Sequence, residues 1–377
     1  MKDLYKNEKR WEDWKLNYYN KAPNGITKES WKLLIEFLKD MELGLNTPVG
    51  KKGRRTTGTL LNLSSHNKIM LEHLHKPIKK LTKKDIHKLE QDIITGEITR
   101  NDGKKYTAFG NYIKDFKVFW KWLMRTQVVN EDITEDITSK TNKPSWVYLS
   151  EKDIRKFFNQ LSFDYRVYCF FLYDTGARVT EALNTRVKDF SEDFSKVTIR
   201  EEVAKTFERT INLKLCTSLI KEYIKVNNLK DDDYIINRKP YTINKYLRYH
   251  CVKMFGKGKI SHPKSKGAYE EFTMYDIRHN SACFWFNKYP THKGIMYRFG
   301  WRNADKIEYY SGFLGVADEL VDIDMVLGAD RDKLLKLEDH NKKMQKEIDR
   351  LNQMVKTMWK GYAEQNKVLK TAVKILK

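Results

Sequence analysis

The chain has 377 residues and a formal net charge of +22, with 72 lysine and arginine residues against 50 aspartate and glutamate residues. Its length predicts two or three domains, each with enough chain to bury a core. The excess of positive charge is larger than solubility requires and predicts a polyanionic partner, for which nucleic acid is the leading candidate. No apolar run reaches the length of a membrane span and no signal-peptide core or lipidation motif is present, which disfavours a membrane partner.

Cysteine and histidine usage indicates a cytoplasmic protein without a bound metal. The cysteines are far apart and lie in apolar or helical contexts, so we expect neither a disulfide framework nor a zinc site. They are Cys169, Cys216, Cys251 and Cys283. The nine histidines form no His-x3-His or His-Glu-x-x-His pattern, which disfavours metal-assisted phosphodiester hydrolysis. We therefore expect no metal and no cofactor.

Residues 1–26 are predicted to form an amphipathic N-terminal arm. Its aromatic residues, placed among lysines, are Trp11, Trp14, Tyr18 and Tyr19. Pro23, with Asn24 and Gly25 after it, ends the helix. The arm either touches DNA or lies as a helix on the next domain, and composition alone does not choose between these two interpretations.

Residues 27–127 are predicted to form a small helical bundle. Apolar residues recur there at the 3.6-residue spacing of four or more amphipathic helices. They are Trp31, Leu34, Ile35 and Leu38, then Met70, Leu71 and Leu74, then Ile86, Leu89 and Ile93, and finally Tyr112, Ile113, Phe116, Phe119, Trp120 and Leu123.

Two basic loops of this bundle are candidate DNA-binding segments. The first is punctuated by glycines and contains Arg54, Arg55, Thr56 and Thr57. Backbone N–H groups and basic side chains in such a loop can contact phosphates. The second leads into the last helix and contains Lys104 and Lys105. The alternative for the first loop is a solvated loop without a ligand, because runs of charge are usually only solvated.

Residues 128–145 are polar, end around Pro144 and are predicted to be a linker. A second domain is expected at residues 146–328. Ser150 and Asp153 resemble a capping box, which predicts the start of the first helix of that domain.

The first motif of this domain reads Tyr-Asp-Thr-Gly-Ala-Arg-Val-Thr-Glu-Ala-Leu over residues 173–183. Gly176 is expected to close an apolar helix, and a second short helix is expected to begin directly after it. This junction aims Arg178 outward, where its guanidinium group can bind two oxygens of one phosphate. Glu181, one helical turn later, is placed to hold or orient neighbouring groups.

The second and third motifs bring further basic side chains. Residues 196–200 and 209–213 alternate as the strands of a hairpin, which leaves Lys205 near its turn. A lysine at that position can reach into a groove. Residues 273–279 resemble a capped helix start that carries Arg278 into the same site.

The fourth motif is Gly300-Trp301, with Tyr310 nine residues after the tryptophan. In order, spacing and residue types, the four motifs resemble the tyrosine recombinase (phage integrase) family. The site of that family consists of an arginine, a hairpin lysine, a His-x-x-Arg, a histidine or tryptophan, and a nucleophilic tyrosine. The resemblance covers residues 145–325 at the level of motifs and extends more weakly to the preceding helices.

The resemblance implies a mainly α fold with a small β-hairpin or sheet. It implies a helical core-binding domain that clamps DNA, here residues 27–127, and an α+β catalytic domain, here residues 146–328. The position and helical character of residues 27–127 agree with such a clamp.

The chemistry of the family needs these residue types. Two guanidinium groups, Arg178 and Arg278, can neutralise and orient the equatorial oxygens of the phosphodiester transition state. Tyr310 is the expected nucleophile and later leaving group. Lys205 is the candidate general acid for the departing DNA hydroxyl. Trp301 would support the site by packing and can donate one indole hydrogen bond to a phosphate oxygen.

An alternative is a buried network of Arg178, Glu181 and Arg278 that only holds helices together. Two buried arginines with one acid would leave positive charge that an anion in the site relieves, which favours a binding site.

Two positions depart from the family pattern or are ambiguous. Tyr275 stands where the family usually has histidine, so a phenol replaces the usual base or phosphate donor. His279, one turn along the same helix, is either a supporting catalytic residue or a histidine of the core. Tyr309 and Tyr310 differ by about 100° around a helix, so only one can face the phosphate. The family spacing from Trp301 favours Tyr310.

Residues 329–377 show a heptad repeat that predicts a coiled-coil tail. One core position holds Leu337, Met344, Leu351, Met358, Gln365 and Ala372, and the other holds Asn341, Ile348, Val355, Tyr362, Leu369 and Leu376. Asn341 and Gln365 at core positions would specify register at some loss of stability. The alternative is a long helix that folds back on its own catalytic domain.

These observations predict a site-specific DNA recombinase or integrase that cleaves and rejoins strands through a covalent 3′-phosphotyrosine, independently of metal and ATP. Its partners would be double-stranded DNA and further copies of itself, as a dimer on one site and a tetramer on paired sites. We expect it to be cytoplasmic and associated with the nucleoid. The alternatives are DNA relaxation of the type IB topoisomerase kind, or a catalytically inactive DNA-binding protein dimerised by its coiled coil.

Overall fold

The computed structural model describes residues 3–48, 53–106, 108–137, 145–289 and 291–315, and six residues of the tail. The chain divides into two compact units, Met1–Trp285 with Tyr297–Gly300, and Phe286–Met296 with Trp301–Lys377. The fold is mainly helical, and the sheet found among the described residues is the predicted two-stranded hairpin. The predicted fold class is therefore confirmed.

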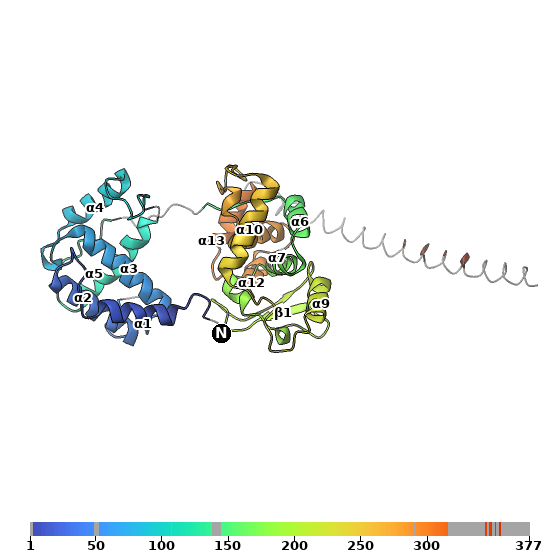
Figure 1. The fold of residues 1–377 in the computed structure, drawn as a ribbon, viewed down its shortest axis with the longest axis horizontal. Helices are drawn as coiled ribbons and strands as arrows, with labels where there is room; N and C mark the ends of the chain where they lie inside the picture. Colours follow the sequence, from blue (N-terminus) through green and yellow to red (C-terminus); the bar gives the residue numbers. More distant parts are fainter. Residues whose placement is uncertain are drawn as a thin grey trace, which may run out of the picture. The chain divides into compact units, whose positions relative to one another are not determined.

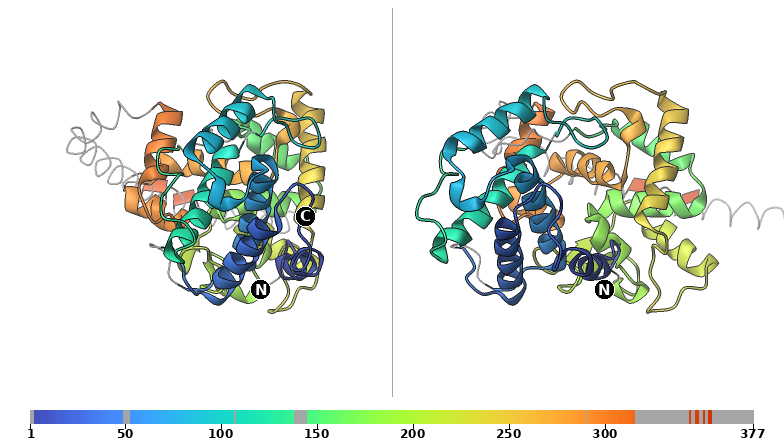
Figure 2. Two further views of the ribbon diagram at one scale, coloured as in Figure 1. Left: turned by 90° about the vertical axis from the view of Figure 1, so that its left-hand side faces the viewer. Right: turned by 60° about the vertical axis from the view of Figure 1, so that its left-hand side comes forward.

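The first part of the chain forms a helical bundle (Figure 1). Its helices are α1 (Asn7–Tyr18), α2 (Lys28–Leu43), α3 (Thr57–Leu74), η1 (Ile78–Lys80), α4 (Lys83–Thr95) and α5 (Phe109–Arg125). Threonine side chains accept hydrogen bonds from backbone N–H groups at the starts of α2, α3 and α4, as the N-cap rule predicts. Figures 1 and 2 show α3 packed against both α2 and α5.

Helix α1 belongs to the bundle. Trp11 is 1% exposed, and its ring stacks on Trp14 with centroids 5.2 Å apart. The indole N–H of Trp11 donates to Glu42 of α2 at 2.8 Å, and that of Trp31 donates to the carbonyl of Tyr18 at 2.8 Å. Of the two interpretations of residues 1–26, the structure shows the helix that lies on the next domain.

Helices α3 and α5 run antiparallel. His66 Nδ1 lies 2.6 Å from Asp115 Oδ2, whereas His73, two turns further along α3, lies 3.4 Å from Tyr106, which precedes α5. Residues later in α3 therefore contact residues earlier in the segment that leads into α5.

Two hydrophobic cores are present, and they share no member among the described residues. One runs from Trp11 to Ile137 and the other from Val147 to Ile277. The predicted linker began at residue 128, but Ile133 and Ile137 are buried in the bundle core. The boundary between the cores therefore lies between residues 137 and 147.

Further helices and the hairpin follow along the chain. The elements are α6 (Glu151–Asn159), α7 (Phe163–Thr175), α8 (Val179–Leu183), η2 (Val187–Asp189), β1 (Lys196–Ile199), β2 (Arg209–Asn212), α9 (Thr217–Val226), α10 (Pro240–Phe255), η3 (Tyr269–Glu271), α11 (Met274–Phe286), α12 (His292–Phe299) and α13 (Asp305–Leu314). Strands β1 and β2 pair antiparallel, with Lys196 opposite Asn212 and Ile199 opposite Arg209. Both strands end one residue earlier than the sequence predicted.

Polar side chains of α11 attach the start of this domain to its core. Asp276 accepts a hydrogen bond from the N–H of Val147 at 2.7 Å, and Asn280 accepts one from the N–H of Leu149 at 2.7 Å. The amide of Asn280 also donates to the carbonyl of Val147 at 2.8 Å. These contacts satisfy backbone groups that burial would otherwise leave without partners.

The predicted coiled coil at residues 329–377 lies almost entirely outside the described residues. Its described apolar members are helical and about half exposed: Met344, Ile348, Leu351, Met354 and Val355. In the part of the chain that the structure covers, no helix has the length and hydropathy that a membrane crossing needs.

Candidate active site

The candidate site begins at the junction between α7 and α8. Gly176 ends α7 in the left-handed region, with φ of +60°, and its N–H donates to the carbonyl of Leu172 at 2.9 Å. A Cβ atom at this position would lie 2.2 Å from the ring of Phe299. Glycine is required both for the backbone angle and for this close approach. The junction leaves Arg178 at the N-cap of α8, the short helix expected after Gly176.

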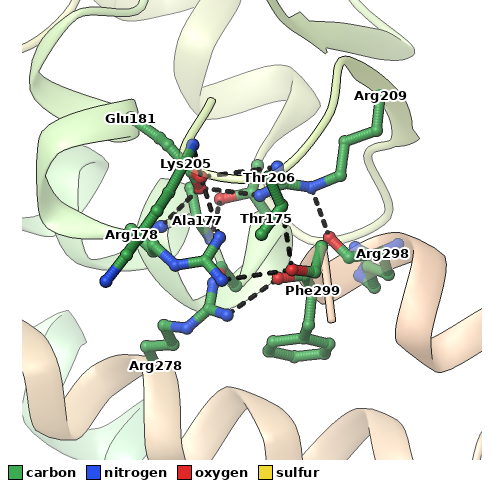
Figure 3. Close-up of polar contacts among 12 residues, drawn as sticks. Thr175, Ala177, Arg178, Glu181, Lys205, Thr206, Arg209, Arg278, Arg298 and Phe299 are labelled. Atoms are coloured by element: carbon green, nitrogen blue, oxygen red, sulfur yellow. Dashed lines mark hydrogen bonds and ion pairs between the residues drawn. The ribbon is translucent and has the colours of Figure 1, made fainter. Parts of the chain in front are cut away.

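Glu181 lies at the centre of the site, with no exposed surface. Its carboxylate accepts from the N–H of Arg178 at 2.8 Å and from Nη1 of the same arginine at 2.9 Å. The backbone N–H of Lys205, in the loop between β1 and β2, also donates to it at 3.4 Å. One buried carboxylate therefore joins the N-terminus of α8 to the hairpin loop (Figure 3).

Arg209 is a second partner of Glu181 that sequence reasoning missed. Its Nη2 lies 2.7 Å from Glu181 Oε2, and both side chains have no exposed surface. The only signal was strand alternation, because Arg209 and Ile211 share the buried face of β2. An arginine on that face predicts a buried acidic partner. Arg178, Arg209, Arg278 and Glu181 are called the arginine cluster below.

Arg209 and Arg178 stabilise the ionised form of Glu181. Burial raises the pKa of its carboxyl group, but the hydrogen bond and charge of Arg209, followed by those of Arg178, outweigh burial and lower this pKa to about 2. Glu181 is therefore ionised throughout the physiological range.

Three consecutive backbone carbonyls, those of residues 298–300, hold the arginine side chains and are called the carbonyl turn. The backbone carbonyl of Arg298 accepts a hydrogen bond from Nε of Arg209 at 3.0 Å, and the carbonyl of Phe299 accepts one from Nη2 of Arg278 at 2.8 Å. Gly300 accepts from Nη2 of Arg178 at 3.1 Å. Figure 3 shows these guanidinium groups around the turn.

Two further contacts complete this arrangement. The hydroxyl of Thr206 donates to the carbonyl of Gly300 at 3.0 Å. Nη1 of Arg278 donates to the carbonyl of Gly176, so Arg278 links the α7–α8 junction to the carbonyl turn. The side chain of Arg178 remains 23% exposed, whereas Arg278 is 9% exposed. Arg278 is thus held by two neutral carbonyl oxygens, and Arg178 by the carbonyl of Gly300 together with the carboxylate of Glu181.

A second buried ion pair anchors the carbonyl turn. Nη2 of Arg298 lies 2.8 Å from Asp174 Oδ1, and its guanidinium group lies 3.8 Å from the ring centroid of Trp285. The other oxygen of Asp174 accepts from the backbone N–H groups of residues 214, 215 and 216, at 2.8, 2.6 and 3.1 Å. The end of α7, the turn after β2 and the end of α12 are therefore joined through one carboxylate.

The other predicted site residues of the first unit are Lys205, Tyr275 and His279. Lys205 is exposed in the hairpin loop, and Tyr275 is 52% exposed at the start of α11. His279 is 6% exposed and stacks on Trp146, with ring centroids 4.7 Å apart, while Tyr275 meets it edge-on at 4.6 Å. These contacts agree with the alternative of a histidine in the core.

Trp301 and Tyr310 lie in the second unit. Their rings stack with centroids 5.5 Å apart and an interplanar angle of 13°. Tyr310 is 4% exposed, whereas Tyr309 is partly exposed and meets the ring of Tyr310 edge-on at 5.0 Å. The predicted nucleophile is therefore the more buried member of the tyrosine pair.

The two candidate DNA-binding loops lie at opposite ends of the α3–α5 pair. Thr56 is the N-cap of α3, so the first loop, with Arg54, Arg55 and Thr57, lies at the N-terminal end of that helix. Lys104 and Lys105 precede Tyr106, which contacts His73 near the C-terminal end of α3. Sixteen residues of helix separate Thr57 from His73, which is about 24 Å. The structure does not bring these two segments together.

Neither a metal site nor a disulfide is found in the described part of the chain. No group of three or more histidine, cysteine, aspartate or glutamate side chains there could hold a metal ion. All four cysteines are free and buried.

Residues 147–312 match the sequence model of the phage integrase family. The resemblance inferred from the four motifs is thereby confirmed. No curated protein matches the chain.

Solved structures support the fold. A lambda integrase dimer bound to a COC′ core site is 14% identical, with a TM-score of 0.54, over 74% of this chain and 93% of that chain. The Tn1549 transposon integrase in complex with circular intermediate DNA is 14% identical, with a TM-score of 0.55, over 74% and 94%. A lambda integrase tetramer bound to a Holliday junction is 14% identical, with a TM-score of 0.53, over 72% and 77%. At these identities the likeness is one of fold.

Proposed function

We propose that the protein is a site-specific DNA recombinase that cleaves and rejoins strands through a covalent 3′-phosphotyrosine. One observation carries this proposal: Arg178 and Arg278 are both held by the carbonyl turn, within a domain of the phage integrase family. Two cationic forks that are oriented before the substrate arrives lose little entropy when they bind a phosphate.

The arginines would stabilise the charge that develops on the phosphate. Neutral carbonyl oxygens orient the guanidinium group of Arg278 without cancelling its charge, whereas Arg178 also pairs with Glu181, which Arg209 shares. Both arginines would direct positive charge to the two non-bridging oxygens. Arginine suits this position better than lysine, since its planar fork matches two oxygens at once.

Lys205 would act on the leaving group and Tyr275 on the phosphate. Lys205 is exposed on a loop whose backbone N–H donates to Glu181, and this attachment of the loop to the arginine cluster supports a role for its ammonium group as proton donor. It would protonate the DNA hydroxyl that leaves during cleavage. Tyr275 is exposed enough to donate a hydrogen bond to a phosphate oxygen in place of the usual histidine. Neither step requires a metal ion or ATP.

Tyr310 would be the nucleophile. Its deprotonated phenolic oxygen would attack the phosphorus atom and form the phosphotyrosine, and the departing DNA oxygen would take its proton from Lys205. The reverse reaction would rejoin the strand. Because the ring of Tyr310 is stacked on Trp301 and almost completely buried, its attack requires the ring to leave that stack. DNA binding would provide the energy for this rearrangement.

The proposed partners are double-stranded DNA and further copies of the chain. The net charge of +22 suits a polyanion, and the structures with a similar fold are integrases bound to DNA as a dimer and as a tetramer. We propose a dimer on one site and a tetramer on paired sites, with the C-terminal heptads contributing to assembly.

A suicide DNA substrate with a nick beside the scissile phosphate tests the proposal. The wild-type protein should form a covalent adduct with DNA that denaturing electrophoresis detects, and Tyr310→Phe should form none. Tyr309→Phe is the matched control, since it removes the neighbouring hydroxyl and should keep the adduct. An adduct that persists in Tyr310→Phe and disappears in Tyr309→Phe would overturn the assignment of the nucleophile.

Two outcomes separate the alternative functions. Relaxation of supercoiled DNA without strand exchange between two sites would indicate a topoisomerase. Binding of DNA without any adduct would indicate an inactive DNA-binding protein.

A further inference from the structure

Arg209 has no part in the reaction outlined above, yet it is the most completely buried arginine of the cluster. It lies on β2 with no exposed side-chain surface, so it cannot contact DNA. It donates from Nη2 to Glu181 at 2.7 Å, from Nη1 to the same carboxylate at 3.5 Å, and from Nε to the carbonyl of Arg298 at 3.0 Å. One guanidinium group therefore contacts both the acid and the carbonyl turn that hold Arg178.

The charges of this group explain why a second arginine is needed. With Arg178 as its only partner, the carboxylate of Glu181 would form a neutral pair with the arginine that is meant to bind phosphate. Arg209 changes this balance, because two arginines and one carboxylate leave one net positive charge. That charge remains available at Arg178, whose side chain is 23% exposed, since Arg209 is sealed inside.

The geometry points the same way. Nη2 of Arg209 donates a hydrogen bond to Oε2 of Glu181. The side chain of Arg178 donates to the other oxygen, Oε1, through its Nη1. The Nη2 group of Arg178 is thereby turned to the carbonyl of Gly300. Without Arg209, Oε2 would keep only the backbone N–H of Arg178 as a donor and could accept a second bond from the guanidinium group of Arg178. Bidentate pairs of this kind are the strong ones.

The space around the carbonyl turn is adapted to Arg209. Gly300 has φ of +59°, and a Cβ atom there would lie 2.9 Å from Arg209 Nη1 and 2.9 Å from Thr206 Oγ1. The turn can pass this close to the guanidinium group because residue 300 has no side chain.

We propose that Arg209 is a positioning residue for the strand-transfer reaction: it occupies and neutralises Glu181, so that Arg178 keeps its charge and orientation for the scissile phosphate. The inference rests on the proposed function and names a residue that acts through Glu181 rather than on DNA.

The first test measures the rate of adduct formation on the suicide substrate, together with DNA affinity. Arg209→Met should slow cleavage by about 100-fold, the usual cost of losing one oriented donor at a developing charge. Its DNA affinity should change less than threefold, since residue 209 is buried. Arg209→Lys keeps the charge but loses the fork, and its rate should lie between those of Arg209→Met and the wild type.

The double variant Arg209→Met/Glu181→Gln distinguishes positioning from a merely structural role. It removes both charges, so Arg178 again carries an uncancelled charge, and it should cleave at least tenfold faster than Arg209→Met. Neutral replacement of a buried ion pair is often tolerated by the fold, so this variant remains measurable where the single variant is unstable. A double variant that cleaves no faster than Arg209→Met overturns the inference.

A second test needs neither DNA nor activity, and it separates this inference from the proposed function. Phenylglyoxal labelling of Arg178 is followed by peptide mass spectrometry, with the surface residue Arg155 as an internal reference. In Arg209→Met, Arg178 takes both oxygens of Glu181 and should be labelled at least threefold more slowly than in the wild type. Equal labelling refutes the inference, whereas a wild-type protein that forms no adduct refutes the proposed function alone.

Discussion

Replacing Glu181 by glutamine should remove a contribution to stability that depends on pH. The arginines lower the pKa of this carboxyl from 4.5 to about 2 in the folded protein, despite the opposing effect of burial. A carboxyl whose pKa is lower in the folded state stabilises the fold above its unfolded pKa, and this stabilisation is lost as the pH falls toward the folded pKa. The shift corresponds to about 3 kcal/mol at neutral pH, of which about 1.4 kcal/mol is lost by pH 3.5.

The measurement is urea unfolding of the wild type and Glu181→Gln at pH 7, 5 and 3.5, followed by far-UV circular dichroism. The difference in free energy of unfolding between the two proteins should narrow by about 1.4 kcal/mol between pH 7 and 3.5, because only the wild type has this group to protonate. Comparison at matched pH cancels the other carboxylates. Glu151→Gln is the control, since an exposed ion pair with Arg155 contributes less than about 1 kcal/mol. A constant difference across this range would refute the proposed ionisation of Glu181.

Two further substitutions test the framework of the site. Gly176→Ala should destabilise the protein by about 3 kcal/mol in urea unfolding, from the left-handed backbone and the clash with Phe299. Gly103 has φ of +75° but open space around it, so Gly103→Ala should lose only about 1 kcal/mol of stability, from backbone strain. An equal loss at both positions would contradict the clash with Phe299. Asp174→Ala should cost about 3–5 kcal/mol, because it leaves Arg298 buried without its carboxylate, and a loss below about 1 kcal/mol would show that this pair does not anchor the carbonyl turn.

Local patterns were sufficient to predict the elements that carry the candidate site. The alternation of residues 196–200 and 209–213 predicted the hairpin, and the spacing of Arg178 and Glu181 predicted a contact within one helical turn. Gly176 was assigned to the end of α7 because only a residue that tolerates the left-handed region suits that position. Each of these inferences involves residues close together in the chain.

The bundle was predicted less completely. Periodicity placed its helices, but composition could not decide whether Trp11 and Trp14 face DNA or a neighbouring helix. The structure answers this through the hydrogen bond from Trp11 to Glu42 and the stacking of the two indoles. The basic loops around Arg54 and Lys104 were chosen by charge alone, and charge carries no information on which ends of two helices lie together.

The order and spacing of four motifs, read along the chain, identified the family, the hairpin and the residues proposed for catalysis. Folding alone revealed what holds them: Arg209 against Glu181, Arg298 against Asp174, and the carbonyls of residues 298–300 against the arginines. Periodicity and capping depend on neighbours within a few residues, so they are readable in sequence. The partners of Glu181 and Asp174 are 28 and 124 residues away, and such contacts arise only when the buried faces of separate elements pack into one core.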